Sequence, residues 1–370
     1  MIRKTGEARK CFRWSDRMRY GLDQVAQHLL GTERLNRCLK SREARRCQLI
    51  DRMYGSIECE EPLVSRPVDR VKDISIAEFR RRYQKPGIPV VFEGAASDWA
   101  CCQKWSLPFL AEQYGDDLVL GRLGFARLET SLAKIDRGAA DYLRFYALLQ
   151  RHPERLHDID LRWLRARRNP GPMNIDQGFQ TFIGNSASPT TNLHNANDAN
   201  LFIQVVGSKH WVFYPSRYTP AIDPPAIRSE YRTHREDVPF FDPFVPDYEA
   251  FPVFQYVPSW EVVLNAGDVL WNPPYVWHAV RNLTDPTIGV GYRWVCPGDC
   301  FRREPLYALL DCLANNPPIW QSIRDADKSF LLVMLEQYEG QRLPKYDQFE
   351  KQVNASYQNY RTLKKQLAKE

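Results

Sequence analysis

Short apolar and β-branched runs, each bounded by turn residues, recur in the second half of the chain and predict β-strands. The clearest cover residues 179–183, 201–206, 209–214 and 287–295, and shorter ones follow Gly267-Asp268 and begin at His278. The turn signal Gly207-Ser208 separates the second run from the third. We therefore predict that 201–206 and 209–214 pair as a β-hairpin.

The run 287–295 has the clearest alternation of apolar and small or polar positions. One face of this strand carries Ile288, Val290, Tyr292 and Trp294. The other face carries Thr287, Gly289, Gly291 and Arg293. This pattern predicts a β-strand with its large side chains all on one side.

Apolar residues at helical spacing predict helices on both sides of the strand-rich region. They occupy residues 15–55, 74–83, 99–114, 131–151 and most of the chain after Arg302, and the tail 346–370 is polar and amphipathic. Residues 58–70 carry two prolines and mixed charge, which is typical of a linker. We therefore predict a helical N-terminal region (1–70), a strand-rich domain (71–300) and a helical C-terminal region (301–370).

Three further segments have no clear periodicity or carry runs of charge. Residues 216–260 are rich in proline and aromatic residues, so we expect a packed functional segment that covers the site and contacts substrate. The arginines of 162–168 form either a solvated surface or a lip that attracts an acidic group, and the former is favoured. The run 41–46 is interpreted as a solvated helix face, with nucleic-acid contact as the weaker alternative.

The composition is that of an ordinary water-soluble globular protein: 44% hydrophobic and 26% charged residues in 370, with a net charge of +6. This charge is modest for a nucleic-acid binder, so nucleic acid is not expected as a partner. Nine dispersed cysteines without a CxxC pair indicate a reducing, cytoplasmic location. The N-terminal residues lack a secretory signal, and the longest apolar run, 330–335, is too short to span a membrane.

Four chemically capable residues lie beside the predicted strands. Thr191 and His194 precede the strand 201–206, Lys209 follows the Gly207-Ser208 turn, and His278 opens a later strand. Taken singly, such a histidine is more often structural, and such a lysine is usually exposed. Together they form a coherent set at the mouth of a small barrel. The other five histidines lack this context.

These residues resemble the JmjC-like cupin family of Fe(II)- and 2-oxoglutarate-dependent oxygenases, over the segment 74–294. The resemblance rests on Thr191 three residues before His194, Asn200 six after it, Lys209 fifteen after it, and His278 after a Gly-Asp turn and a proline. It implies a double-stranded β-helix, that is, a mainly β core with flanking N- and C-terminal helices. It also implies Fe(II) on His194 and His278, and 2-oxoglutarate held by Thr191, Asn200 and Lys209.

One position departs from the family pattern His-x-Asp/Glu, because the third residue here is Ala196. Four explanations stay open. Asp198 could be the third metal ligand, since positions 194, 196 and 198 share a side of an extended segment. Water or halide could fill the gap, as in the halogenase-type relatives. The substrate could bring a carboxylate, or the protein could be a catalytically silent relative that binds a ligand.

The resemblance implies a hydroxylase that acts on a peptide or protein side chain or on a small metabolite. It also implies that the C-terminal helices form a homodimer, as in some relatives, and no membrane partner is expected. The rival class is a cupin-like binding protein without catalysis. Metal content and turnover of 2-oxoglutarate to succinate would separate the two classes.

Overall fold

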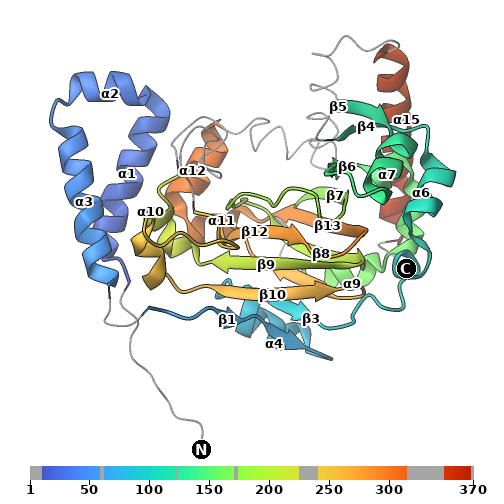
Figure 1. Cartoon of the computed structure of the whole chain (residues 1–370), viewed down its shortest axis with the longest axis horizontal. Helices are drawn as coiled ribbons and strands as arrows, with labels where there is room; N and C mark the ends of the chain where they lie inside the picture. The colour runs from blue at the N-terminus through green and yellow to red at the C-terminus, as the bar shows by residue number, and fades with distance from the viewer. Residues whose placement is uncertain are drawn as a thin grey trace, which may run out of the picture.

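The computed structural model describes residues 11–58, 62–121, 124–170, 174–224, 241–314 and 346–367. Three N-terminal helices, α1 (Trp14–Leu30), α2 (Thr32–Cys38) and α3 (Arg42–Ile57), stand together at one end of the molecule (Figure 1). The predicted helical character of 15–55 is confirmed. α1 ends at Gly31, whose φ of 76° suits a residue without a side chain.

Two sheets, mostly antiparallel, form the centre of the molecule beside these helices (Figure 1). The smaller sheet has the strand order β1 (Arg66–Pro67), β10 (Trp260–Asn265), β9 (Ser208–Tyr214) and β12 (Trp277–Asn282). The larger has the order β2 (Asp69–Val71), β3 (Val90–Phe92), β11 (Val269–Asn272), β8 (Ala199–Val206), β13 (Thr287–Val295), β7 (Ile175–Gly184) and β6 (Leu143–Tyr146). A separate pair joins β4 (Leu118–Gly121) and β5 (Gly124–Arg127).

The chain changes sheet at Gly207, and the predicted hairpin of 201–206 with 209–214 is wrong. β8 pairs with β11 and β13, whereas β9 pairs with β10 and β12. Gly207 has a φ of 71°, and a Cβ there would lie 2.4 Å from the carbonyl oxygen of Pro286, so only glycine fits. A similar crossing at Gly267 joins β10 to β11. Repeated crossing between two sheets is consistent with the predicted double-stranded β-helix.

Apolar side chains fill the space between the two sheets. Phe202, Leu270, Trp211, Phe213 and Leu264 form one buried cluster there, contributed by both sheets. The outer face of the larger sheet carries a second cluster that includes Ile288, Val290, Tyr292 and Trp294. The predicted two faces of strand 287–295 are therefore confirmed.

Helices between β2 and β3 and between β3 and β7 cover the outer face of the larger sheet. They are α4 (Ile76–Phe79) with the π-helical turn η1 (Arg80–Gln84), α5 (Ala100–Lys104), α6 (Leu107–Tyr114), α7 (Leu128–Asp136), α8 (Leu148–Arg151), η2 (Pro153–Asp158) and α9 (Leu161–Ala166). The helices predicted at 74–83 and 99–114 are confirmed. The single helix predicted at 131–151 is wrong, because α7 ends near Gly138 (φ 81°) and 143–146 pairs with β7 instead.

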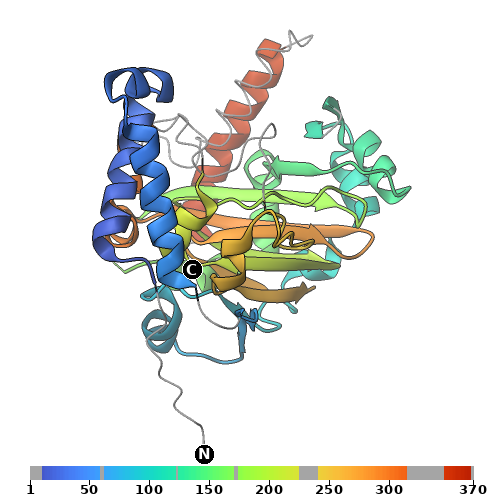
Figure 2. The same ribbon diagram turned by 60° about the vertical axis from the view of Figure 1, so that its left-hand side comes forward.

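The C-terminal helices follow the last strand: α11 (Pro297–Arg303), α12 (Pro305–Ala314) and α15 (Tyr346–Leu367). α15 is the long red helix in Figure 2, and it packs against α8 and η2. Its Tyr360 is fully buried, and Lys364 forms a buried ion pair with Asp176 of β7 at 2.8 Å. This side of α15 is occupied within the chain, and the homodimer expected through the C-terminal helices stays a prediction. The helix expected at 330–338 lies outside the described residues.

The proline- and aromatic-rich segment is described over 216–224 and 241–260, and 225–240 lies outside the described residues. It forms η3 (Ser216–Tyr218), α10 (Thr219–Ile222) and η4 (Pro252–Tyr256). Phe241 and Phe254 stack with ring centroids 3.9 Å apart, in a cluster that also contains Met53 and Ile57 of α3. This part of the segment therefore packs between the barrel and the N-terminal helices.

The arginines of 162–168 are mostly packing residues. The Arg167 guanidinium lies 3.4 Å from the ring centroid of Trp163, and Arg168 pairs with Asp176 at 3.2 Å. The favoured solvated-surface interpretation therefore fails for Arg167 and Arg168, and it fits Arg162, which is exposed. Within the described part of the chain, no helix combines the length and the apolar character needed to cross a membrane.

Candidate metal and cosubstrate site

His194 and His278 lie opposite each other across an isolated antiparallel bridge. The His194 N–H donates to the His278 carbonyl at 3.0 Å, and the reverse bond measures 2.7 Å. The two imidazole centroids are 4.3 Å apart, with a 52° angle between the planes. β12 presents His278 after the Pro273-Pro274 stop, so two residues that are 84 positions apart in sequence become neighbours.

Both imidazoles are oriented by their own backbone. Nδ1 of His194 donates to the carbonyl of Asn192 at 2.7 Å, and Nδ1 of His278 donates to the carbonyl of Val276 at 3.0 Å. A carbonyl oxygen can only accept, so Nδ1 carries the hydrogen and Nε2 carries the lone pair in each ring. This is the tautomer that a metal ligand needs. The amide nitrogen of Asn272 lies 3.3 Å from Nε2 of His278 and can donate to it.

The surroundings keep both histidines neutral. Burial, with Arg293 and Arg144 nearby, lowers the pKa of His194 to about 4. Burial and the neighbouring His194 hold the pKa of His278 well below its usual value. Neutral imidazole is the form that binds metal, so no proton must leave before coordination at physiological pH.

The third ligand of a facial triad is not supplied by the neighbouring side chains. Ala196 offers only a methyl group, and its carbonyl accepts a hydrogen bond from the N–H of Tyr275 at 2.7 Å. Asp198 accepts from the Arg293 guanidinium at 3.0 and 3.1 Å. Among the residues that the structure describes, no three His, Cys, Asp or Glu side chains form a group that could hold a metal. The site fits two imidazole ligands and lacks a preformed carboxylate ligand.

Lys209 is buried inside the barrel, with 1% of its surface exposed. Its ammonium group contacts Asn282 and the hydroxyl of Thr287, the latter at 3.0 Å, and the Tyr142 ring centroid is 5.5 Å away. These partners are neutral, and burial lowers the pKa of Lys209 to about 7. A buried cation without an anionic partner is costly, so a ligand carboxylate fits here.

Thr191 and Asn200 lie on the strands and connections around this interior. The Thr191 hydroxyl accepts from the N–H of Val280 at 2.7 Å, while its contact with the Val280 carbonyl is a weak 3.4 Å. Asn200 is 1% exposed, yet neither its amide oxygen nor its amide nitrogen has a hydrogen-bond partner in the described structure. Unpaired buried amide groups are rare, and they fit a pocket that receives a polar ligand.

Sequence reasoning gave no role to several residues that the fold brings to this interior. Asn272 and Arg293 flank Asn200 on the neighbouring strands β11 and β13, in one row across the larger sheet. Arg293 shares the small-residue face of 287–295, so that alternation was the signal that could have found it. Asn282, Thr287 and Tyr142 surround Lys209 through pairings that no local pattern reveals.

His210 lies next to Lys209 on β9 and points to the other face, where its Nε2 lies 3.2 Å from a Glu261 carboxylate oxygen. Burial is the main factor that lowers the pKa of His210. His152 lies 2.7 Å from Asp117, remote from the paired histidines in the chain and in a different cluster. His234 lies outside the described residues.

Residues 139–297 match the model of the cupin-like domain family. A lysine-specific demethylase 8 of Xenopus tropicalis is 28% identical over 236 residues, which are 60% of this chain and 51% of that protein. The arginine-specific demethylase JMJ22 of Arabidopsis thaliana is 25% identical over 230 residues, covering 59% and 44% of the two chains.

A human protein, the bifunctional peptidase and (3S)-lysyl hydroxylase JMJD7, is 24% identical over 288 residues, covering 64% of this chain and 86% of that protein. The chain spans about half the length of the first curated relatives that it matches, with 51%, 44% and 52% covered. The family match, residues 139–297, contains both paired histidines, His194 and His278.

Proposed function

This chain belongs to the JmjC family of cupin-like proteins, and on that premise we propose that it is an Fe(II)- and 2-oxoglutarate-dependent oxygenase of protein side chains. Two histidines, His194 and His278, bind the metal, and the carboxylate ligand of the usual triad is absent. The family typically uses Fe(II) and 2-oxoglutarate. A small metabolite stays the alternative substrate.

The observation that carries the proposal is the pair of oriented imidazoles. Each Nδ1 is fixed by a backbone carbonyl, at 2.7 Å for His194 and 3.0 Å for His278, so both Nε2 atoms present lone pairs. A histidine with a purely structural role does not require a second neutral histidine beside it. Here the two ring centroids are 4.3 Å apart. Two such nitrogens on one side suit Fe(II), with the remaining positions open.

Iron held by His194 and His278 would supply the chemistry in which O2 converts 2-oxoglutarate to succinate and CO2, with one oxygen atom entering succinate and the other entering a substrate C–H bond. The residues of this chain bind, orient and exclude water. Lys209 receives the remote carboxylate of 2-oxoglutarate, and Thr191 adds a hydroxyl donor. The aromatic side chains of Trp211, Phe202 and Phe213 exclude water from the barrel interior.

The substrate is proposed to be a protein side chain because relatives carry the names lysine-specific demethylase, arginine-specific demethylase and lysyl hydroxylase. Access to the site is proposed to pass beside residues 241–260, since these aromatics pack over the smaller sheet that carries His278. Asp198 can bind the metal only if its carboxylate separates from the Arg293 guanidinium.

A second candidate function is supported by the Asp198–Arg293 pair. The Arg293 guanidinium contacts both carboxylate oxygens of Asp198, at 3.0 and 3.1 Å. The methyl group of Ala196 cannot replace them as a metal ligand. A pocket with a buried lysine and no third metal ligand would suit a cupin-like protein that binds a 2-oxo acid without turning it over. A halide in the vacant position would instead give a halogenase-type oxygenase.

The test is succinate formation from 2-oxoglutarate by purified protein loaded with Fe(II) under air. We expect turnover by the parent and none by His278→Ala, and added chloride should change the product only in the halogenase case. Metal and 2-oxoglutarate binding without any succinate would instead support the silent binding protein.

A further inference from the structure

A cavity of about 420 Å³ lies between α1 and α3, away from the paired histidines in sequence and in fold. Five arginines line it: Arg19, Arg42, Arg45, Arg46 and Arg52. Asp23 is the one acidic residue among the described residues of its lining. Such a concentration of guanidinium groups around one hollow is unusual for a merely solvated helix face.

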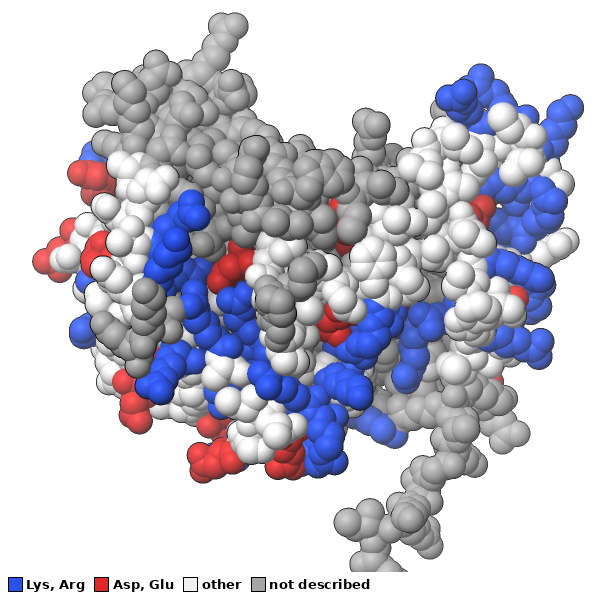
Figure 3. Space-filling view, turned by 180° about the vertical axis from the view of Figure 1, so that it is seen from behind, with Lys and Arg blue, Asp and Glu red and all other residues white. Residues whose placement is uncertain are grey.

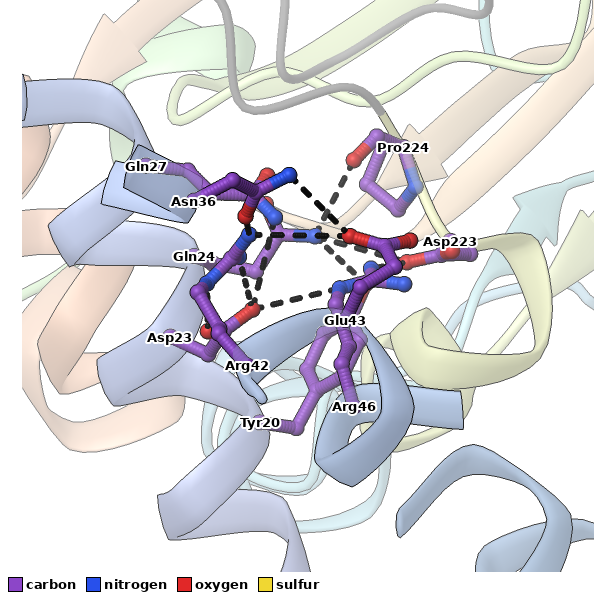
Figure 4. Close-up of polar contacts among 10 residues, drawn as sticks. All are labelled: Tyr20, Asp23, Gln24, Gln27, Asn36, Arg42, Glu43, Arg46, Asp223 and Pro224. Carbon is purple, nitrogen blue, oxygen red and sulfur yellow. Dashed lines mark hydrogen bonds and ion pairs between the residues drawn. The ribbon is translucent and has the colours of Figure 1, made fainter. Parts of the chain in front are cut away.

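Two of these arginines hold the cavity in shape (Figure 4). Arg42 donates to both carboxylate oxygens of Asp23 at 2.7 and 2.6 Å, and 4% of its surface is exposed. Arg46 donates to Asp23 at 3.1 Å and to Asp223, which follows α10. Tyr20 also donates to Asp223 at 2.6 Å. This network fixes α1 and α3 to each other and to the barrel domain.

The other three arginines face outward and are available to a ligand. Arg19 and Arg45 are exposed, and no described side chain pairs with either. Arg52 has a side chain that is 49% exposed and touches Asp16 at 3.1 Å. Arg45 and Arg52 are seven residues apart, which is about 10 Å along a helix. This distance is roughly three phosphate-to-phosphate spacings along the axis of one nucleic-acid strand.

The charge of the whole chain is concentrated in this region. Residues 1–57 contain 14 Lys and Arg against 6 Asp and Glu, so the remaining 313 residues, with 37 against 39, are slightly acidic. Figure 3 shows Lys and Arg crowding the end of the molecule where the N-terminal helices stand, at the right of the view. Residues 1–13 contribute five Lys and Arg against one Glu, and residues 14–57, which span α1–α3, contribute nine against five Asp and Glu, so the net charge of +6 hides a basic N-terminal region.

We propose that the helices α1–α3 bind the phosphodiester backbone of a nucleic acid, with phosphates contacting Arg19, Arg45 and Arg52 at the mouth of the cavity. Arginine suits this role because its planar fork binds phosphate oxygens in pairs. From Trp14 to Ile57 there are eight arginines and one lysine, which favours phosphate over the single carboxylates of an acidic protein. The surface is independent of the metal site, so it is testable without iron or 2-oxoglutarate.

The experiment measures binding of the full, metal-free chain to fluorescent single-stranded RNA, single-stranded DNA and duplex DNA over a range of salt concentrations. Arg19→Glu with Arg45→Glu should weaken binding at least tenfold. It should also reduce the slope of log K against log salt by about 1.4 on single strands, since each lost phosphate contact contributes about 0.7. The nucleic acid that binds with the highest affinity identifies the kind of nucleic acid that this surface prefers.

The matched control is Arg137→Glu with Lys365→Glu, which changes the net charge equally at exposed positions outside α1–α3. It should alter binding by no more than about twofold at physiological salt, because distant exposed charges are screened. Equal loss in both variants would overturn the proposal, as would the absence of binding to all three nucleic acids. Displacement of the nucleic acid by polyglutamate at equal charge concentration would also overturn it and indicate an acidic protein partner.

Discussion

Ala196 stands between His194 and Asp198 in the segment that carries the first histidine. Among the described residues no carboxylate joins the two imidazoles in a metal-binding group, and Arg293 holds Asp198 from the neighbouring strand. Whether this centre binds metal strongly therefore depends on what oxygen or halide occupies the remaining position.

Ala196→Asp should raise the affinity for Fe(II) or Mn²⁺ by adding a hard anionic oxygen to two imidazoles. Mn²⁺ binding followed by electron paramagnetic resonance measures the change. Asp198→Ala is the companion variant: it should leave metal affinity unchanged if water or halide is the ligand, and release metal if Asp198 has taken over. An unchanged affinity in Ala196→Asp would mean that this methyl group does not face the metal.

Lys209→Ala should weaken 2-oxoglutarate binding by roughly ten- to hundredfold, the value of one charge-assisted contact. Titration calorimetry measures it, with Lys85→Ala as an exposed-lysine control. Equal affinities for the parent and Lys209→Ala would remove Lys209 from the binding site.

The affinity for 2-oxoglutarate should also depend on pH through the same residue. Burial lowers the pKa of Lys209 to about 7, so the ligand-free protein loses this charge as pH rises above 7. Binding the carboxylate then requires proton uptake, and affinity should fall by up to about tenfold per pH unit above 7 and stay constant below it. Calorimetry at pH 6.5 and 8.5, in two buffers of different ionisation enthalpy, measures the number of protons taken up when 2-oxoglutarate binds. No proton uptake at pH 8.5 would contradict the assignment.

Secondary-structure elements were predictable where their signal is local. β13 shows its two faces in its own alternation, and β3 follows a turn with a buried apolar run. The partners of β8 and β9 were not predictable, because each pairs with strands more than 45 residues away. The stretch 131–151 has helical spacing, yet residues 143–146 gain more by pairing with β7.

The residues of the candidate site were also predictable only where their sequence signal is local. The offsets between Thr191, His194, Asn200 and Lys209 are local, so sequence identified them as a set. The Asp198–Arg293 pair joins residues 95 positions apart, and the orphaned amide of Asn200 depends on burial, so neither could be found without the fold.

A buried ion pair joins α15 to β7, beside the apolar packing of Tyr360. Lys364 and Asp176 have side chains that are 3% and 15% exposed. Although burial alone would raise it, Lys364 and Arg168 hold the pKa of Asp176 well below its usual range. The pair therefore stabilises the fold at neutral pH, and this contribution is lost as the pH falls and Asp176 takes up a proton.

Lys364→Ala should lower the free energy of unfolding by about 3 kcal/mol, since it leaves a buried carboxylate with fewer partners. Urea denaturation at pH 7 measures it, and Lys365→Ala, next along the helix and exposed, is the control. Similar small effects in both variants would show that α15 is not anchored through Lys364.

Residues 241–257 are expected to respond to occupation of the site. They pack against the smaller sheet and α3, in the cluster that contains Trp277 directly before His278. Hydrogen exchange should show added protection of this segment when Mn²⁺ and 2-oxoglutarate are both present. Protection limited to β8, β12 and β13 would leave the segment as packing alone.

The molecule as a whole joins two units of different charge. A basic helical unit, α1–α3, is tied through Arg46 and Asp223 to a slightly acidic barrel domain. The cupin-like match covers 139–297 and leaves these helices outside it. This separation explains why the whole-chain charge gave no indication of a basic surface.

The most direct test of the account is the stoichiometry of Mn²⁺ binding by the parent, His194→Ala and His278→Ala under anaerobic conditions, with 2-oxoglutarate present. The account predicts one metal per chain in the parent, none in either variant, and unchanged circular dichroism spectra in all three. One metal per chain in His194→Ala or His278→Ala, as in the parent, would contradict it.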